Sequence, residues 1–319
     1  MITVKNLSKK FASVEALKGI NFSIEKGEIY GLLGPNGAGK TTTISILSTL
    51  TKPDTGDVSV NGFDLNKDAQ KIKRIIGVVP QEIALYQELS AYDNLIFWGS
   101  LYDIPSDKLK EKVNEILKLV GLFERKDDKI KTYSGGMKRR INIASALLHS
   151  PEIIFMDEPT VGIDPQSRNL IYEVIEKLNK SGITIVYTTH YMEEAERLCK
   201  RIGIIDNGKI IAQGTLDELR AATNSQQCIS ISITNIKEDR VENENLVSKF
   251  IKEELADIPN GNLLFRNGAL RYFTKDVKTD LLRLINRLAK FGFEISHIDI
   301  QRPTLESIFL SLTGKELRD

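Results

Sequence analysis

The sequence predicts an α/β protein in which a large mixed-sheet unit is followed by a small α+β domain. In the first 220 residues, short β-branched and apolar runs alternate with longer helical stretches, which is typical of a sheet covered by helices. Beyond residue 228 the expected order becomes βαββαβ with a last helix, which is the order of a ferredoxin-like sandwich. At roughly 150 residues per domain, 319 residues agree with two domains.

The expected strands of the first unit are of two kinds. Continuous apolar runs suit strands that are buried on both faces, and four are present: 29–33, 75–79, 153–156 and 183–187. Other runs are interrupted by polar or turn residues and indicate an antiparallel sheet: 2–4, 20–24 and 57–62. Helices are expected at 42–50 and within 90–122, where apolar residues recur at helical spacing after Ser106.

The expected boundary between the domains is a polar linker at 221–227. It divides a domain of residues 1–220, with a helical subdomain at about 85–150, from a domain of residues 228–319. The elements expected in the second domain are a strand at 229–233, a helix at 246–255, a hairpin around Asn267-Gly268, a helix at 279–291, a strand at 295–300 and a helix at 304–312.

Composition excludes several classes of protein. The 44 basic and 43 acidic residues give a net charge of +1, which argues against bulk electrostatic capture of nucleic acid. The two cysteines, Cys199 and Cys228, cannot build a disulfide framework and favour a reducing compartment. No stretch approaches the roughly 18 apolar residues of a membrane span, and the first residues lack the apolar core of a signal peptide. We therefore expect a cytoplasmic chain whose membrane part, if any, belongs to another chain.

A phosphate-binding loop is predicted at residues 34–41, which fit the pattern G-x-x-x-x-G-K-[ST] between an apolar run and a helical stretch. Glycines let backbone N–H groups converge on phosphate oxygens, and the following helix adds its positive N-terminal end. Lys40 would reach the β- and γ-phosphates and Thr41 would bind Mg²⁺. The alternative is a glycine-rich turn that binds nothing.

A pair of acidic residues forms a second predicted site, where the apolar run 153–156 ends in Asp157 and Glu158. The first carboxylate suits Mg²⁺, usually through water, and the second can polarise an attacking water. Alone, such a pair is more often a helix cap or a solvated turn. Beside a phosphate loop, the catalytic interpretation is favoured.

With these residues in place, the chain resembles the nucleotide-binding subunits of ATP-binding-cassette (ABC) transporters over about residues 1–220. The family's further elements follow in order: the Q-loop glutamine Gln81, a signature loop at 133–140, a D-loop at 162–165 and the switch histidine His190. Phe11 occupies the place of the aromatic residue that stacks on adenine.

The resemblance implies the roles of the site residues. ATP would be held by the phosphate loop and its flanks: Phe11, Gly34, Pro35, Asn36, Gly37, Ala38, Gly39, Lys40, Thr41 and Thr42. Mg²⁺ would be bound by Thr41, Gln81 and, from further out, Asp157. Glu158 would be the general base, with His190 and Gln81 as catalytic partners. Two cassettes would enclose ATP, so that Ser134, Gly135 and Gly136 act in trans next to the D-loop residue Asp164.

The resemblance has two departures. Tyr133 and Met137 replace the Leu and Gln that usually begin and end the signature, and Ile163 replaces the commoner Leu of the D-loop. Because the phosphate-contacting core of the signature is intact, we expect activity to survive.

Other residues invite simpler interpretations. His149 is expected in an exposed turn, and His297 in a structural role on a strand outside the cassette. The run 138–140 is expected to form a solvated basic face. A helical face either packs in the core or lines the groove that receives a coupling helix from a membrane subunit: Tyr92, Leu95, Trp98 and Tyr102.

The C-terminal stretch 301–314 resembles the ending of the ABC-2-type exporter group, which includes drug-resistance and sodium-efflux ATPases. The resemblance implies an Mg-ATP-driven subunit, working as a homodimer or cassette heterodimer beneath a separate permease at the inner face of the cell membrane, with no nucleic acid. One alternative is a soluble ABC ATPase of translation, repair or cofactor assembly. The other is a degenerate, non-hydrolysing module, which the presence of Lys40, Asp157, Glu158 and His190 disfavours.

Overall fold

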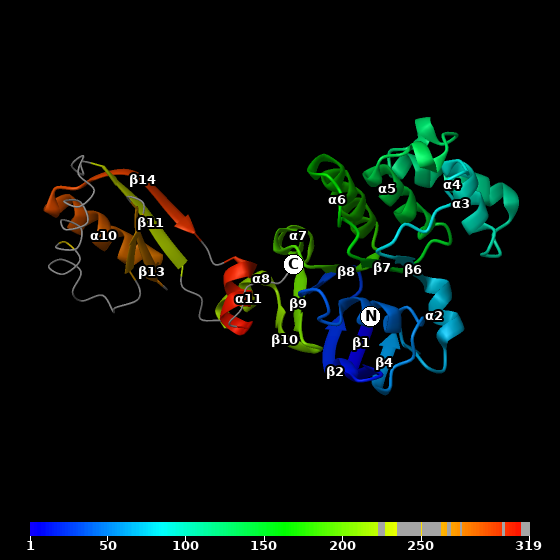
Figure 1. The fold of residues 1–319 in the computed structure, drawn as a ribbon, viewed down its shortest axis with the longest axis horizontal. Coiled ribbons are helices and arrows are strands. Elements are labelled where there is room, and N and C mark those ends of the chain that lie inside the picture. Colours follow the sequence, from blue (N-terminus) through cyan, green and yellow to red (C-terminus); the bar gives the residue numbers. More distant parts are fainter. Residues whose placement is uncertain are drawn as a thin grey trace. The chain divides into compact units, whose positions relative to one another are not determined.

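The computed structural model describes residues 1–222, 227–234, 250, 263–266, 269–274, 276–301 and 304–313. The chain divides into two compact units, which consist mainly of Met1–Leu219 and Arg220–Leu312 and are described separately (Figure 1). No helix in the described ranges is both long and apolar enough to cross a membrane.

A six-stranded, mostly parallel sheet forms the centre of the first unit. Its strands, in spatial order, are β10 (Lys209–Gly214), β9 (Arg201–Asp206), β3 (Ile29–Leu33), β8 (Thr184–Thr189), β7 (Ile153–Asp157) and β6 (Ile76–Val79). Neighbouring strands are parallel from β9 to β6, and β10 is antiparallel to β9. The four continuous apolar runs are thus confirmed as strands. The bounds of 29–33 are as expected, and those of the other three are shifted by one or two residues.

A second, antiparallel sheet confirms the other kind of strand. Its order is β2 (Val14–Ile24), β1 (Ile2–Phe11), β4 (Thr55–Val60) and β5 (Phe63–Asp64). The strands β1 and β2 run well beyond the expected residues 2–4 and 20–24, because they pair with each other through irregular positions up to Phe11 and Val14. Such irregularities hide the period-2 pattern on which the sequence prediction depended.

The six-stranded sheet separates two hydrophobic cores. One face, with Leu32, Phe155 and Val186, packs against the antiparallel sheet and α1 (Lys40–Leu47). The other face, with Met156 and Tyr187, packs against helices, as Figure 1 shows for α6 (Pro165–Lys180). Every residue of β3, β7 and β8 is buried, which is why these strands read as unbroken apolar runs.

Further helices connect or follow the strands of the first unit in sequence. Three of them, with two short 3-10 turns, fall between β6 and β7: α3 (Ala91–Gly99), α4 (Ser106–Leu119), η1 (Phe123–Arg125), η2 (Ile130–Thr132) and α5 (Gly135–Ser145). The others are α2 (Ala69–Ile75), α7 (Met192–Leu198) and α8 (Leu216–Ala222). Of the expected linker, residues 221–222 end α8, residue 227 begins the next strand, and 223–226 lie outside the described residues.

The second unit has the strand order of a ferredoxin-like sandwich. Its sheet runs β12 (Leu263–Arg266), β13 (Ala269–Thr274), β11 (Gln227–Thr234) and β14 (Glu294–Gln301), and every neighbouring pair is antiparallel. The helix α10 (Val277–Phe291) connects β13 to β14, and α11 (Leu305–Thr313) follows. The helix expected at 246–255 lies outside the described residues except for Phe250, which is helical and buried.

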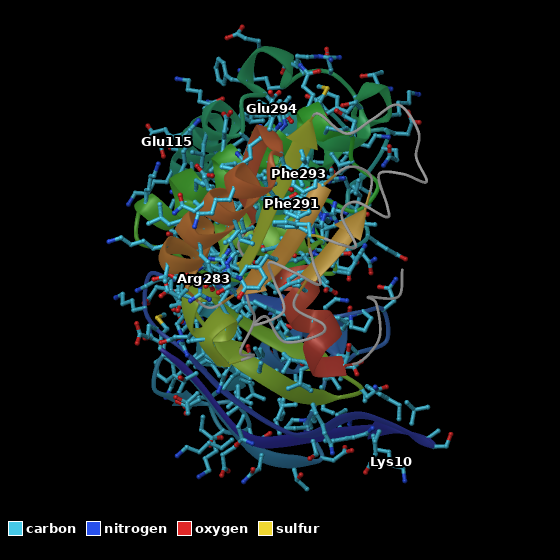
Figure 2. The ribbon with its side chains drawn as sticks, turned by 90° about the vertical axis from the view of Figure 1, so that its left-hand side faces the viewer. Lys10, Glu115, Arg283, Phe291, Phe293 and Glu294 are labelled. Carbon is cyan, nitrogen blue, oxygen red and sulfur yellow. The ribbon has the colours of Figure 1, made fainter. Side chains whose placement is uncertain are left out.

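Three aromatic rings help to hold the second core together. Phe291 and Phe293, labelled in Figure 2, stack at 5.4 Å around the C-terminal end of α10. Phe250 meets both rings edge-on at 5.2 and 5.4 Å. Asp276 caps the start of α10, its carboxylate accepting from the N–H of Thr279, and Gly292, in the left-handed conformation, caps the end.

Two expectations about surface residues are wrong. In the run 138–140, Arg139 and Arg140 are only 3% and 9% exposed, and each donates to backbone carbonyls, Arg139 to those of Pro80 and Gln81 and Arg140 to that of Val120. His149 is not plainly exposed, because its ring stacks on Tyr102 at 4.1 Å and its Nε2 lies 2.7 Å from the Ile76 carbonyl oxygen. Burial lowers the pKa of His149.

Candidate nucleotide site

The carboxyl ends of three neighbouring strands bring the predicted site residues together. β3 leads into the phosphate loop, β7 ends at Asp157, and β8 ends at Thr189 just before His190. Because these strands are parallel and adjacent, their ends meet at one edge of the sheet. Residues far apart in sequence therefore face a common space.

The phosphate loop takes a conformation that requires its glycines. Gly39 caps α1 with φ of 112°, in the left-handed region, and a Cβ there would lie 2.7 Å from the Ala16 carbonyl oxygen. At Gly34 a Cβ would lie 2.1 Å from the carbonyl oxygen of Ile205. The loop thus packs directly against backbone and leads into the start of α1, where anions are favoured.

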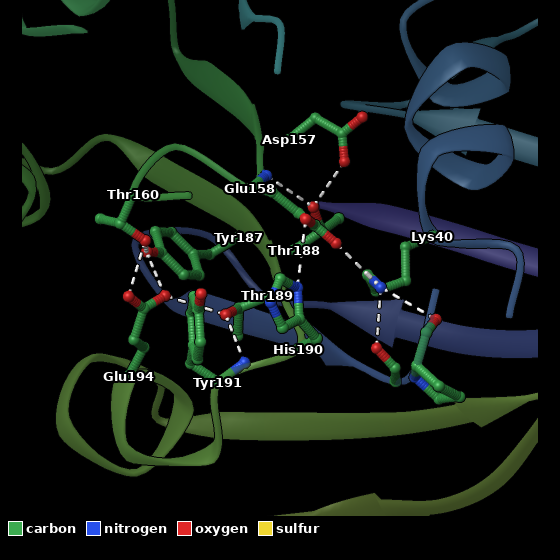
Figure 3. Close-up of polar contacts among 12 residues, drawn as sticks. Lys40, Asp157, Glu158, Thr160, Tyr187, Thr188, Thr189, His190, Tyr191 and Glu194 are labelled. Atoms are coloured by element: carbon green, nitrogen blue, oxygen red, sulfur yellow. Dashed lines mark hydrogen bonds and ion pairs between the residues drawn. The ribbon is translucent and has the colours of Figure 1, made fainter. Parts of the chain in front are cut away.

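A cavity of about 930 Å³ opens over this loop. It is lined by predicted residues (Asn36, Gly37, Gly39, Lys40, Thr41, Thr42, Gln81 and Glu158) and by residues that the sequence did not single out (Lys10, Ser13, Val14, Glu15, Ala16, Lys18 and Asn207). The predicted loop residues Gly34, Pro35 and Ala38 are not among the lining residues. Figure 3 shows polar contacts of two lining residues, Lys40 and Glu158, and of the residues around them.

Lys40 is held in a buried cluster. Its side chain is 4% exposed, and its Nζ donates to the carbonyl oxygens of Gly34, at 2.7 Å, and Pro35, at 3.0 Å. The same ammonium lies 2.9 Å from Oε1 of Glu158 (Figure 3). The lysine is therefore fixed by the loop itself and paired with a carboxylate at the position where phosphates would arrive.

The carboxylate of Glu158 lies between the ammonium of Lys40 and the imidazole of His190. Its second oxygen, Oε2, is 3.2 Å from His190 Nδ1, within ion-pair distance, although the angle is not that of a hydrogen bond. The Glu158 backbone has φ of 44°, a left-handed conformation that side-chain-bearing residues rarely adopt. Such backbone strain clusters at functional sites, where the surrounding structure holds it in place.

The hydroxyl of Thr188 connects the two acidic residues. It donates to Oδ1 of Asp157 at 2.6 Å and accepts from the backbone N–H of Glu158 at 3.0 Å. All three residues are buried. This contact could not be predicted from the sequence, because Thr188 lies 31 residues from Asp157 and its neighbours indicate only a strand.

The backbone at Gln81 is held by hydrogen bonds from α5. The guanidinium of Arg139, on α5, donates to the carbonyl oxygens of Pro80 at 2.7 Å and Gln81 at 2.5 Å. Burial lowers the pKa of Arg139. The amide side chain of Gln81 remains exposed and lines the cavity.

The signature and D-loop residues occur at helix starts. Ser134 caps α5 by accepting from the Met137 N–H, and Asp164 caps α6 by accepting from the Ser167 N–H, which lowers the pKa of Asp164. A Cβ at Gly136 would lie 2.3 Å from Cβ of Ser167, so the two helices approach closely there. The predicted signature residues Ser134, Gly135 and Gly136 are not among the residues lining the cavity.

Phe11 lies at the end of β1 and is 49% exposed, with the Lys9 ammonium 5.3 Å from its ring. It is not among the lining residues, whereas Val14, its partner across the hairpin, is.

The arrangement is suited to holding a polyphosphate and activating water next to it. A glycine-rich loop, a helix start and a buried ammonium bind anions, and a carboxylate beside an imidazole can accept a proton. These features define a phosphate-loop nucleotide-binding protein.

Comparison with known proteins narrows the class. The profile of the family described as "ABC transporter" matches residues 17–161. The chain is 45% identical to the linearmycin resistance ATP-binding protein LnrL of Bacillus subtilis, with all of both chains covered. It is 34% identical to the daunorubicin resistance ATP-binding protein DrrA3 of Streptomyces coeruleorubidus (99% of this chain, 97% of the relative) and 35% identical to a Nod factor export ATP-binding protein of Ralstonia nicotianae (100% and 95%).

Solved structures agree with these relatives. A cassette bound to ADP and phosphate in a post-hydrolysis state superposes with a TM-score of 0.62 and 31% identity, covering 68% of this chain and 99% of that one. An ATP-binding subunit of an ABC transporter superposes with a TM-score of 0.63 and 30% identity, covering 70% and 93%. The chain belongs to the ABC transporter family, and it is an ATP-binding subunit with ATPase activity.

Proposed function

We propose that this chain powers an ABC-2-type exporter, as one of two cassettes that close on ATP beneath a separate permease at the cytoplasmic face of the membrane. The cassette would comprise residues 1–220, with its helical subdomain at about 85–150, and residues 228–319 would form an accessory domain. The full-length likeness to relatives named for drug resistance and Nod factor export supports the direction of transport.

The observation that carries the catalytic assignment is the buried chain of contacts from Lys40 through Glu158 to His190. On arrival of ATP, its phosphates replace Glu158 as the partner of Lys40. The freed carboxylate, at the end of a strand and beside the imidazole, then acts as the general base toward water. His190 contacts the γ-phosphate and orients that water.

The residues around the loop fit Mg²⁺. Thr41 and Gln81 line the cavity, and Asp157 lies at the end of β7 on the same edge of the sheet, so hydroxyl, amide and carboxylate oxygens of the kind that Mg²⁺ prefers are available. When bound, the ion would neutralise charge on the β- and γ-phosphates.

Two cassettes are needed to complete the site. The signature residues at the start of α5 offer a serine hydroxyl and free N–H groups, and they do not line the cavity of their own chain. We assign Ser134, Gly135 and Gly136 to the ATP of the partner cassette, with Asp164 at the same contact. One of the solved neighbours is titled a dimeric ABC transporter cassette, which supports this arrangement.

An apolar groove suits the permease. A cavity of about 450 Å³ is lined by Trp98 and Tyr102 together with Leu50, Ile76, Val78 and Pro80, whereas Leu95 is fully buried and Tyr92 packs on the core. The predicted helical face is thus divided between core and groove. A neighbouring cavity of about 560 Å³ shares Lys73 and Tyr102 with it. Its lining carries one carboxylate, Asp103, and four cations, none of them in an ion pair in the described part of the chain: Lys73, Arg74, Lys108 and Lys112. We assign these surfaces to an amphipathic segment of the permease with acidic residues beside its apolar ones.

The test is recovery of partners from the chain's own cells in detergent, with a Lys108→Glu/Lys112→Glu variant alongside. We expect the wild-type chain to retrieve a polytopic membrane protein and the variant to retrieve less of it. A Lys110→Glu variant, on the same helix but outside the cavity lining, is the matched control. Recovery of soluble assembly, ribosomal or DNA-associated proteins alone would favour the soluble alternative and leave the ATPase assignment standing.

A further inference from the structure

Glu194 is a buried carboxylate for which neither the fold nor the proposed catalysis accounts. It lies on α7, is 1% exposed, and accepts hydrogen bonds from four side-chain hydroxyls, of which Figure 3 draws those of Thr160, Tyr187 and Thr189. The nearest cation, Nε of Arg168, stands 3.8 Å from Oε1, beyond hydrogen-bonding distance. Burying a charge is costly unless hydrogen bonds satisfy it, so four donors on one carboxylate require an explanation.

The two oxygens of Glu194 hold different segments. Oε1 accepts from Thr160 at 2.6 Å and from Tyr172 on α6 at 2.9 Å. Oε2 accepts from Tyr187 at 2.9 Å and from Thr189 at 2.8 Å, both on β8. Burial and the adjacent carboxylate raise the pKa values of Tyr172 and Tyr187, so both hydroxyls stay protonated and able to donate.

These two segments carry the catalytic pair. Thr160 follows Glu158 by two residues, and Thr189 directly precedes His190. The Thr189 hydroxyl also accepts from the N–H of Tyr191 at 2.9 Å, so it fixes the backbone on both sides of the histidine. A single carboxylate thus links the turn after the general base to the turn that presents the imidazole.

We propose that Glu194 is a positioning residue that sets the spacing between Glu158 and His190. It touches neither side chain and acts through Thr160 and Thr189. This inference rests on the proposed roles of Glu158 and His190. In this proposal, the hydrogen bonds of Glu194 hold the catalytic residues in position. The bond from Thr189 matters for His190, whereas the bond from Tyr172 connects Glu194 only to α6.

The first test observes His190 directly and requires no turnover. The full chain has only three histidines, so ¹⁵N-histidine NMR gives three ring systems that single substitutions can assign. We expect Thr189→Val to shift the His190 ring nitrogen signals, and Thr189→Ser, which keeps the hydroxyl, to restore them. Tyr172→Phe is the matched control, because it removes one hydroxyl from the same carboxylate, and it should leave His190 unchanged.

The second test is kinetic. Thr189→Val should lower kcat for ATP hydrolysis at least tenfold with KM for ATP changed less than twofold, since small displacements of catalytic groups cost this much in rate. Thr189→Ser should recover kcat, and Tyr172→Phe should keep it within twofold. Glu194→Gln, whose amide can accept from only two of the four hydroxyls, should resemble Thr189→Val.

The proposal is overturned if Thr189→Val leaves both the His190 signals and kcat at wild-type values. It is also overturned if Thr189→Val and Tyr172→Phe lower kcat equally, because the cluster would then serve stability alone. Thermal unfolding of each variant separates loss of fold from loss of geometry. A His190→Ala variant with wild-type turnover would instead refute the proposed role of His190, and the NMR comparison would still report whether Glu194 positions its ring.

Discussion

Replacing Glu158 with Gln should strengthen ATP binding while it suppresses hydrolysis. In this structure the Glu158 carboxylate occupies Lys40 at 2.9 Å, with both side chains about 95% buried, so incoming phosphates must displace it. The Gln amide would still accept a hydrogen bond from the Lys40 ammonium but would lose the ion-pair attraction of the carboxylate, so it should compete less by about 1 kcal/mol. That difference corresponds to an ATP Kd about fivefold lower.

The effect on turnover should go the opposite way. Loss of the general base should lower kcat about 100-fold or more, because positioned bases contribute factors of this size. Nucleotide titration by calorimetry and phosphate release on the full chain measure the two quantities separately. Glu173→Gln, an exposed change of equal charge on α6, should leave both near wild type.

A Glu158→Gln variant that binds ATP with wild-type or weaker affinity would refute the reasoning, because the carboxylate would then not compete for Lys40. A variant that hydrolyses ATP at the wild-type rate would refute the general-base assignment. The two results are independent, so each part of the argument can fail alone.

Further changes have defined outcomes. Lys40→Ala should weaken ATP binding about tenfold or more and abolish phosphate release, since a charged hydrogen bond of about 1.5–3 kcal/mol is lost. Gly77→Ala would place a Cβ 2.4 Å from the Ala146 carbonyl oxygen, and should destabilise the fold by about 2 kcal/mol and lower Tm by about 4–8 °C in calorimetry. Because burial lowers the pKa of His149, the folded state resists a proton that the unfolded state accepts below about pH 6.5, and stability should fall there. Urea unfolding at pH 7.5 and 5.5 should show a smaller loss for His149→Gln.

Much of the fold was predictable, because local pattern determines it. Strands such as 153–157, buried on both faces, leave unbroken apolar runs, and the phosphate loop carries its own signal in its glycines and Lys40. The strand order of the second unit followed from the expected order of its elements. These features depend on neighbours in sequence.

The supporting contacts of the site were not predictable from one sequence. Thr188 and Glu194 reach partners on other strands and helices, and nothing in their local pattern marks them. The sequence pattern indicates that Arg139 belongs to a solvated basic face. Only the tertiary fold shows that two backbone carbonyls accept hydrogen bonds from its guanidinium and so satisfy the buried charge. That Val14 lines the cavity and Phe11 does not likewise depends on how β1 and β2 pair.

The fork of Arg139 has a mechanical consequence. The planar guanidinium makes two hydrogen bonds, to the consecutive carbonyls of Pro80 and Gln81. This geometry holds α5 and the backbone at Gln81 in a fixed relative position, so that the two segments move together. The start of α5 carries the signature residues, and Gln81 faces the phosphate cavity. A displacement of the groove beside Trp98 would therefore be transmitted both to Gln81 and to α5. A phosphate that draws Gln81 into the cavity would likewise shift the signature end of α5.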